Sequence, residues 1–207
     1  MGDTRRRLLD GAIETVRSQG ISAVSARTIA ATAGVNQALV FYHFDSVDNL
    51  LAQACLVSTE ERVERFRERF AEVDSFSGLL ALGARLHEEE SEAGNVTVLA
   101  QMLAGAQRDP KVAEATAAAV GLWVSEIEHV LRRLLAGSPL DGLLDPAALA
   151  RTVAATFVGL ELFEPVAPTG STLAELAKLV EVVDELGPLA RRVVRAKLRN
   201  TVKKERA

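Results

Sequence analysis

The chain has 207 residues, of which 48% are hydrophobic, and a formal net charge of -4. A chain of this length can bury a substantial core, and its single cysteine, Cys55, excludes an internal disulfide framework and a cysteine-based zinc site. The sequence contains neither a run of about 20 apolar residues that would span a membrane nor the apolar segment of an export signal. We therefore expect a cytoplasmic protein that has no membrane partner.

The charge is unevenly distributed along the chain. Acidic residues predominate between positions 51 and 190, and basic residues predominate in the segment 191–207. Because an acidic surface repels nucleic acid, any contact with DNA would have to come from a local surface near one end of the chain. The basic segment itself suits either a partner-binding tail or the favourable placement of cations at the end of a helix.

Helical periodicity dominates, and no strand-like alternation bounded by hairpin turns is present. The pattern predicts an all-α fold of roughly nine or ten helices. The first helices are predicted over residues 4–19, 25–33 and 35–42, with a fourth beginning after Ser46. Gly20 and Gly34 are placed to end the first two, while Ser25 and Ser46 are placed as N-caps.

Two short helices joined at Gly34 have the layout of a helix-turn-helix. Five small or branched residues would form its core: Ile29, Ala30, Ala33, Val35 and Val40. Asn36, Leu39 and His43 fall on one stripe of the second helix, and Gln37 lies beside them at its N-terminal end. Amides of this kind can bond an adenine edge, and Leu39 suits either a thymine methyl group or the domain core.

Residues 7–51 resemble the tetracycline-repressor (TetR) family of bacterial regulators. The segments that carry the resemblance are "RLLDGAIETVRSQG" and "SARTIAATAGVNQALVFYHFDSVDNLL". The resemblance implies a helix-turn-helix DNA-binding domain over residues 1–47 and a helical ligand-binding and dimerisation domain over residues 48–207. It also implies a homodimer that binds double-stranded DNA at a palindromic operator.

By position, the resemblance implies two groups of DNA contacts. Those expected to face bases are Asn36, Gln37 and Leu39. Those expected to touch phosphates or neighbouring bases are Ser25, Arg27, Tyr42 and His43.

Two positions depart from the family pattern. Phe41 stands where a tyrosine is usual, and Val47 stands where a lysine is usual, so a phosphate donor and a positive charge are missing. We expect a shallow dependence of DNA affinity on salt, with most of the remaining charge supplied by Arg27 and by the arginines at positions 5 to 7. The same departures leave open a helical small-molecule carrier with weakened DNA binding.

The effector site is predicted from bulky or polar residues within otherwise apolar helices. The set comprises Phe66, His87, Gln101, Met102, Trp123, Phe157 and Glu161, with Phe70, Leu86 and Phe163 as further members. These residues suit a largely apolar effector of unknown identity, and each also suits an ordinary place in the core. Glu161 would favour a cationic group if it were partly buried, and a dimer-interface or solvated role is the alternative.

The sequence favours neither an enzyme nor a cofactor-binding protein. It contains no Gly-rich phosphate loop, nucleophile elbow or pair of histidines at metal-binding spacing. The segment "HEEESE", residues 87–92, would support a metal-dependent helical enzyme only if several of its side chains converged, and we interpret it as a solvated charged face. The function predicted is a ligand-responsive transcriptional regulator that acts as a repressor.

Overall fold

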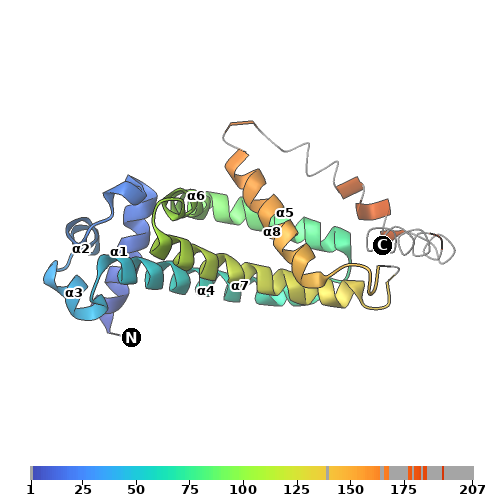
Figure 1. Ribbon diagram of the computed structural model, residues 1–207, viewed down its shortest axis with the longest axis horizontal. Helices are drawn as coiled ribbons and strands as arrows, with labels where there is room; N and C mark the ends of the chain where they lie inside the picture. The colour runs from blue at the N-terminus through green and yellow to red at the C-terminus, as the bar shows by residue number, and fades with distance from the viewer. Residues whose placement is uncertain are drawn as a thin grey trace. The chain divides into compact units, whose positions relative to one another are not determined.

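The structure is a computed structural model, and it describes residues 2–138, 140–163, 166–167, 177–178, 180–182, 184–185 and 193. The side chain of Glu161 and nearly all of the basic segment 191–207 lie outside the described residues. Within the described part, all regular structure is helical and no strand occurs, which confirms the predicted all-α class (Figure 1). None of the described helices is both long enough and apolar enough to cross a lipid bilayer.

The described helices begin and end close to the predicted positions. Their bounds are α1 Asp3–Gln19, the 3-10 helix η1 Ile21–Ala23, α2 Ala26–Ala33, α3 Ala38–Phe44, α4 Val47–Glu72, α5 Phe76–Glu92, α6 Asn95–Ala106, α7 Pro110–Leu135 and α8 Pro146–Phe163. Gly20 ends α1 with a positive φ of 83°, and the Ser46 hydroxyl accepts the Asn49 amide at the start of α4. The third helix differs from the prediction, since it begins and ends later than expected.

The chain divides into two compact units. Unit 1 comprises residues 1–65 and 88–122, and unit 2 comprises residues 66–87 and 123–207. Helices α4, α5 and α7 each contribute one part to each unit. The functional division expected after residue 47 remains a prediction.

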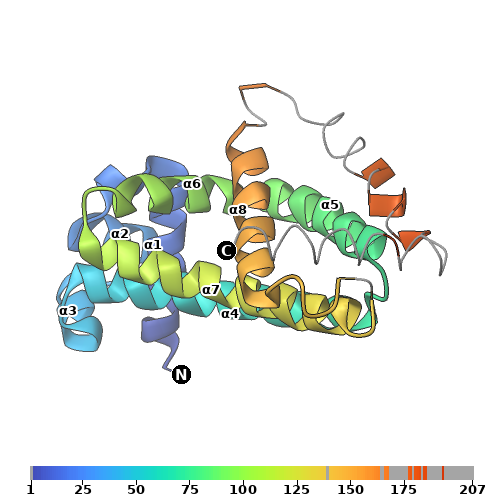
Figure 2. The ribbon, with the colours of Figure 1, turned by 45° about the vertical axis from the view of Figure 1, so that its right-hand side comes forward.

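Unit 1 is built around the first helix. One face of α1 buries Leu8, Ala12 and Val16 against Ile29 of α2 and Phe44 of α3. Helix α6 packs on α1 as well, and the two lie side by side in both ribbon views (Figures 1 and 2). Its buried contributions to this core are Val98 and Met102. The three helices of the helix-turn-helix region are therefore held by a core that includes α6.

Unit 2 has its own apolar core, drawn from α4, α5, α7 and α8. Its most buried members include Phe66, Val130, Leu131 and Ala150. Arg133 closes the C-terminal end of α4 by donating to the carbonyls of Phe70 and Val73, at 2.8 and 3.1 Å. The Phe70 carbonyl in the last turn of α4 also accepts the Val73 amide at 3.4 Å, and the Val73 carbonyl lies just past the helix, so the arginine supplies both with a donor from outside the helix.

Candidate nucleic-acid interface

The second helix begins with a complete capping box. The Ser25 hydroxyl accepts the Thr28 amide at 3.1 Å, and the Thr28 hydroxyl accepts the Ser25 amide at 3.0 Å. Two of the amides that a helix leaves unpaired at its start are thereby satisfied. Ser25, expected to touch DNA, thus has a defined structural role, and Arg27 in the same first turn is exposed.

The turn between α2 and α3 requires glycine. Gly34 has φ 62° and ψ 41°, the left-handed region that favours residues without a side chain. Arg7 of α1 donates from Nη2 to the carbonyls of Ala33 and Gly34, at 2.7 and 2.9 Å. A Cβ at position 34 would lie 2.9 Å from the same nitrogen. The turn is therefore fixed both by its own backbone and by a side chain from α1.

The start of α3 carries the two amides predicted to read bases. The Asn36 side-chain oxygen accepts the Ala38 amide at 2.8 Å, so it caps the helix. That oxygen keeps one lone pair, but bonding an adenine edge through both amide atoms would compete with the cap. Gln37 is exposed and has no such role in α3.

Helix α3 presents some of its predicted contact residues and partly buries others. Val40 and Phe44 lie in the core, while 79% of Tyr42 is exposed. Leu39 is half-buried and packs against the unit 1 core, as the alternative reading of this residue anticipated. His43 is also half-buried, and its ring meets that of Tyr42 edge-on, with centroids 4.9 Å apart. The exposed face of α3 thus runs from Asn36 and Gln37 to Tyr42.

The two positions that depart from the family pattern take up different environments. Val47 is half-buried and packs against the unit 1 core, whereas Phe41 is 49% exposed. A lysine at position 47 would have to bring its charge out past this apolar contact.

The arginines at positions 5 to 7 are engaged within unit 1, which differs from the expectation that they supply charge to DNA. Arg5 lies over the Phe44 ring, 5.0 Å from its centroid. Arg6 pairs with Asp10 and with Glu61, and Arg7 holds the α2–α3 turn. The run of basic residues suggested a surface for phosphates, but its side chains have carboxylate, carbonyl and aromatic partners close by.

The predicted effector residues fall into both units. Gln101 and Met102 belong to unit 1, where the Gln101 side-chain oxygen accepts the Ile21 amide at 3.2 Å and Met102 is buried in the core. Phe66 and Trp123 of unit 2 form an edge-on pair with centroids 5.9 Å apart. His87 and Phe157 form a second pair in unit 2, with centroids 6.5 Å apart. Four of the predicted effector residues therefore form two aromatic pairs in unit 2, whereas Gln101 and Met102 belong to unit 1.

The further members of that set also lie in unit 2. Phe70 and Leu86 are buried in its core, and 62% of Phe163 is exposed at the end of α8.

The acidic segment 87–92 is only partly the solvated face that we expected. Glu90 is 7% exposed and forms an ion pair with Arg62 of α4. Among the described residues, no group of three histidine, cysteine, aspartate or glutamate side chains is placed to hold a metal ion. The sequence offered no signal for the Arg62–Glu90 pair, because its partners lie 28 positions apart.

Comparison with known proteins identifies the helix-turn-helix. Residues 8–54 match the family model of bacterial regulatory proteins of the tetR family. This N-terminal segment therefore belongs to the tetR family of bacterial regulatory proteins. Uncharacterized HTH-type transcriptional regulators of Mycobacterium tuberculosis and Mycobacterium bovis are 24% identical over 132 residues, which cover 64% of this chain and 68% of theirs.

Solved structures of three transcriptional regulators share the fold of this chain. A protein from Rhodococcus sp., described as a TetR-family transcriptional regulator, matches with a TM-score of 0.73 and 23% identity over 89% of this chain and 100% of its own. FadR from Bacillus subtilis, solved in complex with stearoyl-CoA, matches with a TM-score of 0.67 and 16% identity, covering 87% of this chain and 97% of FadR. A transcriptional regulator from Saccharomonospora viridis, solved with choline, has a TM-score of 0.65 and 19% identity over 87% of this chain and 95% of its own.

Proposed function

We propose that this TetR-family regulator is a homodimeric repressor that binds a palindromic operator and releases it when a small, largely apolar effector binds. The observation that carries the proposal is the placement of α3. Val40 and Phe44 anchor the helix in the core, while Gln37 and Tyr42 extend from it into solvent. A helix fixed in this way can present an amide to base edges and a phenol to phosphates.

The proposed DNA contacts divide by chemistry. Base contacts are assigned to Asn36, Gln37 and Leu39, and contacts to phosphates or neighbouring bases to Ser25, Arg27, Tyr42 and His43. Arg27 is exposed in the first turn of α2, where the helix dipole also favours an anion. Ser25 would act chiefly by fixing that turn, since its hydroxyl is held in the capping box.

The test of DNA binding is fluorescence anisotropy with the DNA immediately upstream of the protein's own reading frame. The double variant Gln37→Ala, Tyr42→Ala is compared with the unsubstituted chain at two salt concentrations in the presence of nonspecific competitor. Losing one base contact costs about 1–3 kcal/mol, so we expect affinity to fall tenfold or more. Gln107→Ala, which removes another exposed glutamine from the end of a helix, is the matched control and should bind normally.

Equal binding by the double variant and the unsubstituted chain would refute the assigned contacts. The helical carrier would be favoured if the protein bound an effector but, in a wider operator search, bound no DNA in the presence of nonspecific competitor. Phe41 and Val47 are the sequence features that support this second candidate, because they remove a phosphate donor and a charge.

The proposed dimer would form through the exposed face of α8. Thr152 and Thr156 are exposed, yet their hydroxyls donate to the carbonyls of Ala148 and Thr152, at 3.0 and 2.9 Å. The face therefore presents methyl groups beside the exposed Ala155, and it suits close packing against a second copy. Ala155→Arg should yield a monomer in sedimentation equilibrium, whereas Ala118→Arg on α7 should leave the dimer intact. A dimer in both variants would rule out this face.

The effector contacts are assigned to four of the predicted residues of unit 2, namely Phe66, His87, Trp123 and Phe157. The solved relatives carry ligands as different as stearoyl-CoA and choline, so the fold does not fix the effector's chemistry. Trp123 is the protein's single tryptophan and therefore a specific fluorescence probe. Titration with stearoyl-CoA and with choline compares a ligand that has a long acyl chain with a small cation. We expect stearoyl-CoA to change the fluorescence emission of Trp123 and choline to leave it unchanged.

A further inference from the structure

A groove of about 290 Å³ opens in unit 1 between α1 and α4. None of the residues that line it belongs to the predicted DNA contacts or to the predicted effector contacts. Its floor is apolar, since Leu9 and Ile13 of α1 and Ala54 of α4 are buried and the half-buried Val57 adjoins them. A water molecule takes up about 30 Å³ in the liquid, so the groove holds a ligand of about ten non-hydrogen atoms.

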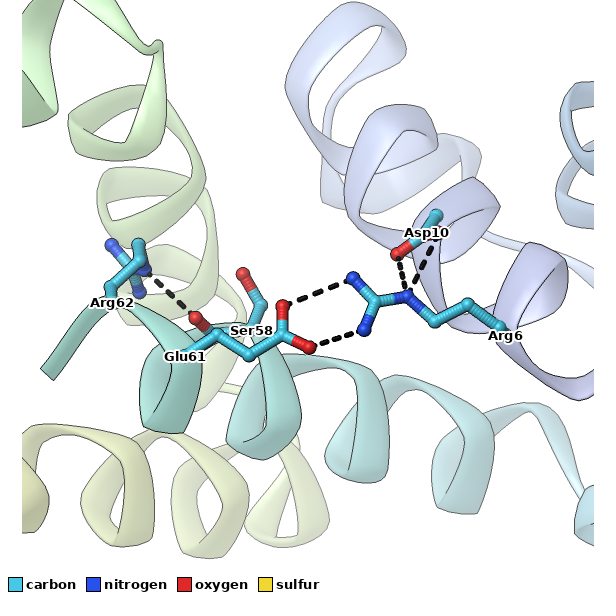
Figure 3. A network of polar contacts seen from close by, with 5 residues as sticks. All are labelled: Arg6, Asp10, Ser58, Glu61 and Arg62. Atoms are coloured by element: carbon cyan, nitrogen blue, oxygen red, sulfur yellow. Dashed lines mark hydrogen bonds and ion pairs between the residues drawn. The ribbon is translucent and has the colours of Figure 1, made fainter. Parts of the chain in front are cut away.

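Charged side chains form the rim of this groove, and at one end Arg6 lies between two carboxylates. Its Nε donates to both oxygens of Asp10, at 2.9 and 3.0 Å, and its Nη2 donates to Glu61 Oε2 at 3.0 Å (Figure 3). A second bond, from Nη1 to Glu61 Oε1, makes the contact with Glu61 bidentate. Among the described residues that line this end, one guanidinium faces two carboxylates, which leaves a negative charge uncompensated at neutral pH.

At the other end of the rim the charges cancel. Arg17 of α1 donates from Nη1 to Glu14 Oε2 at 3.1 Å, and from Nη2 to the side-chain oxygen of Asn95 at 3.3 Å. One guanidinium here faces one carboxylate and one neutral amide. The groove is therefore polarised along its length, and a cationic group is favoured at the Arg6 end.

Two further arginines of α4 lie near Glu61 in the sequence, but they do not fill this end of the groove. Figure 3 shows Arg62 projecting away from Glu61, and Arg62 pairs with Glu90 of α5. The hydrogen bond from Arg6 is the main cause of the lowered pKa of Glu61, and the charge of Arg65, one turn further along α4, adds to it. Arg65 is exposed and lies outside the set of residues that line the groove.

The two carboxylates at the Arg6 end can accept further hydrogen bonds. Each has about four lone-pair sites and receives two bonds from Arg6. The side chains of Asp10 and Glu61 are 57% and 50% exposed, so a donor that enters from solvent can reach them. A primary ammonium group carries three donors, no acceptor and one positive charge, which matches both the spare acceptors and the uncompensated charge.

We propose that this groove is a binding site for a small organic cation, a primary ammonium group joined to an apolar body of about eight carbon atoms. The ammonium head bonds Asp10 and Glu61. The apolar body covers Leu9 and Ile13, which removes hydrocarbon surface from water. The site belongs to unit 1 alone, so it is separate from the effector contacts assigned in unit 2 and does not depend on DNA.

Nuclear magnetic resonance of the full-length protein with 2-phenylethylammonium tests the site. Titration over the millimolar range should shift the amide signals of α1 and of residues 54–61, and those of α8 should stay in place. Two matched probes isolate the charge, because 2-phenylethanol is neutral and phenylacetate is an anion. The cation should bind about two- to fivefold more tightly than the alcohol, the range for an exposed ion pair, and phenylacetate should bind more weakly still. Equal affinities, or shifts only outside α1 and residues 54–61, would overturn the proposal.

Substitution of the rim carboxylates tests which groups hold the ammonium head. Asp10→Asn and Glu61→Gln should each weaken binding of 2-phenylethylammonium about two- to fivefold and leave binding of 2-phenylethanol unchanged. Glu60→Gln is the matched control, since it removes the same charge from an exposed neighbour that does not line the groove, and it should bind normally. An equal loss in Glu60→Gln, or no loss in either rim variant, would contradict the assignment.

Substitution of Ser58 tests the groove without changing its charge. Ser58 lines the groove from α4, so Ser58→Leu should fill the space and abolish binding of both the ammonium and the alcohol. Ser58→Ala, which leaves the space open, should retain binding. Equal binding by the two variants would show that the probes lie elsewhere. These titrations contain neither DNA nor stearoyl-CoA, so a failure of the proposed repressor function would leave their results unchanged.

Discussion

Gly11 of α1 gives the most direct test of how closely the DNA-binding helices pack. A Cβ placed on Gly11 would lie 2.9 Å from the Cβ of Ala33 and 3.1 and 3.2 Å from its backbone nitrogen and Cα. Helix propensity alone predicts that Gly11→Ala stabilises α1 by up to about 1 kcal/mol. Overpacking costs about 1–3 kcal/mol, and the upper half applies here because the obstacle is the backbone of α2. We therefore expect Gly11→Ala to lower the free energy of unfolding by about 1–2 kcal/mol.

The matched control is Gly121→Ala in α7. Among the described residues, a Cβ at this exposed helical position meets no atom within 4 Å outside the backbone of its own helix, so only propensity acts and the free energy of unfolding should rise by about 0.5–1 kcal/mol. Urea unfolding followed by circular dichroism, at one fixed protein concentration, measures both changes. The two substitutions are chemically identical, so opposite signs would isolate the contact with Ala33. A stabilised Gly11→Ala protein would refute the close approach of α1 and α2.

Three further predictions concern the capping box, the turn and the ion pair of unit 1. Ser25→Ala should lower the free energy of unfolding by about 1 kcal/mol in urea titration, since it removes the N-cap of α2, and Thr28→Ala should remove the reciprocal bond. Gly34→Ala should cost about 1–2 kcal/mol through its left-handed backbone, and in the Arg7→Gln background the cost should fall, because the side chain that the new Cβ meets is gone. The hydrogen bond from Arg6 lowers the pKa of Glu61 below its ordinary value of 4.5, so this pair stabilises the fold above about pH 4.5 and the contribution is lost as the pH falls through the lowered value. The free energy of unfolding, measured across this pH range, should depend less steeply on pH in Glu61→Gln than in the unsubstituted chain. An unchanged pH dependence in this variant would contradict the stabilising role of the Arg6–Glu61 pair.

Local chemistry explains what could be predicted from the sequence. The start of α2 depends on the Ser25 cap, and the turn depends on the freedom of Gly34 at positive φ, so both follow from a few adjacent residues. The predicted start of α3 is too early, because nothing local distinguishes an Asn36 whose side chain accepts the Ala38 amide from an Asn36 within the helix. Burial of Val40 and Phe44 follows from the helical period. The parts of the site fixed by neighbouring residues were therefore predictable to within a few positions.

Bonds between distant positions explain what was not predicted. The arginines at the start of α1 are basic whatever they touch, and only the fold brings Phe44, Glu61 and the Ala33 carbonyl within their reach. The same holds for Gln101, which bonds the Ile21 amide 80 positions away. A count of basic residues in the sequence therefore overstates the positive charge that is available to DNA phosphates. An arginine that leaves an internal carboxylate to bind DNA loses one ion pair as it forms another. For this protein we therefore expect affinity for DNA to depend more on the hydrogen bonds of α2 and α3 than on its number of basic residues.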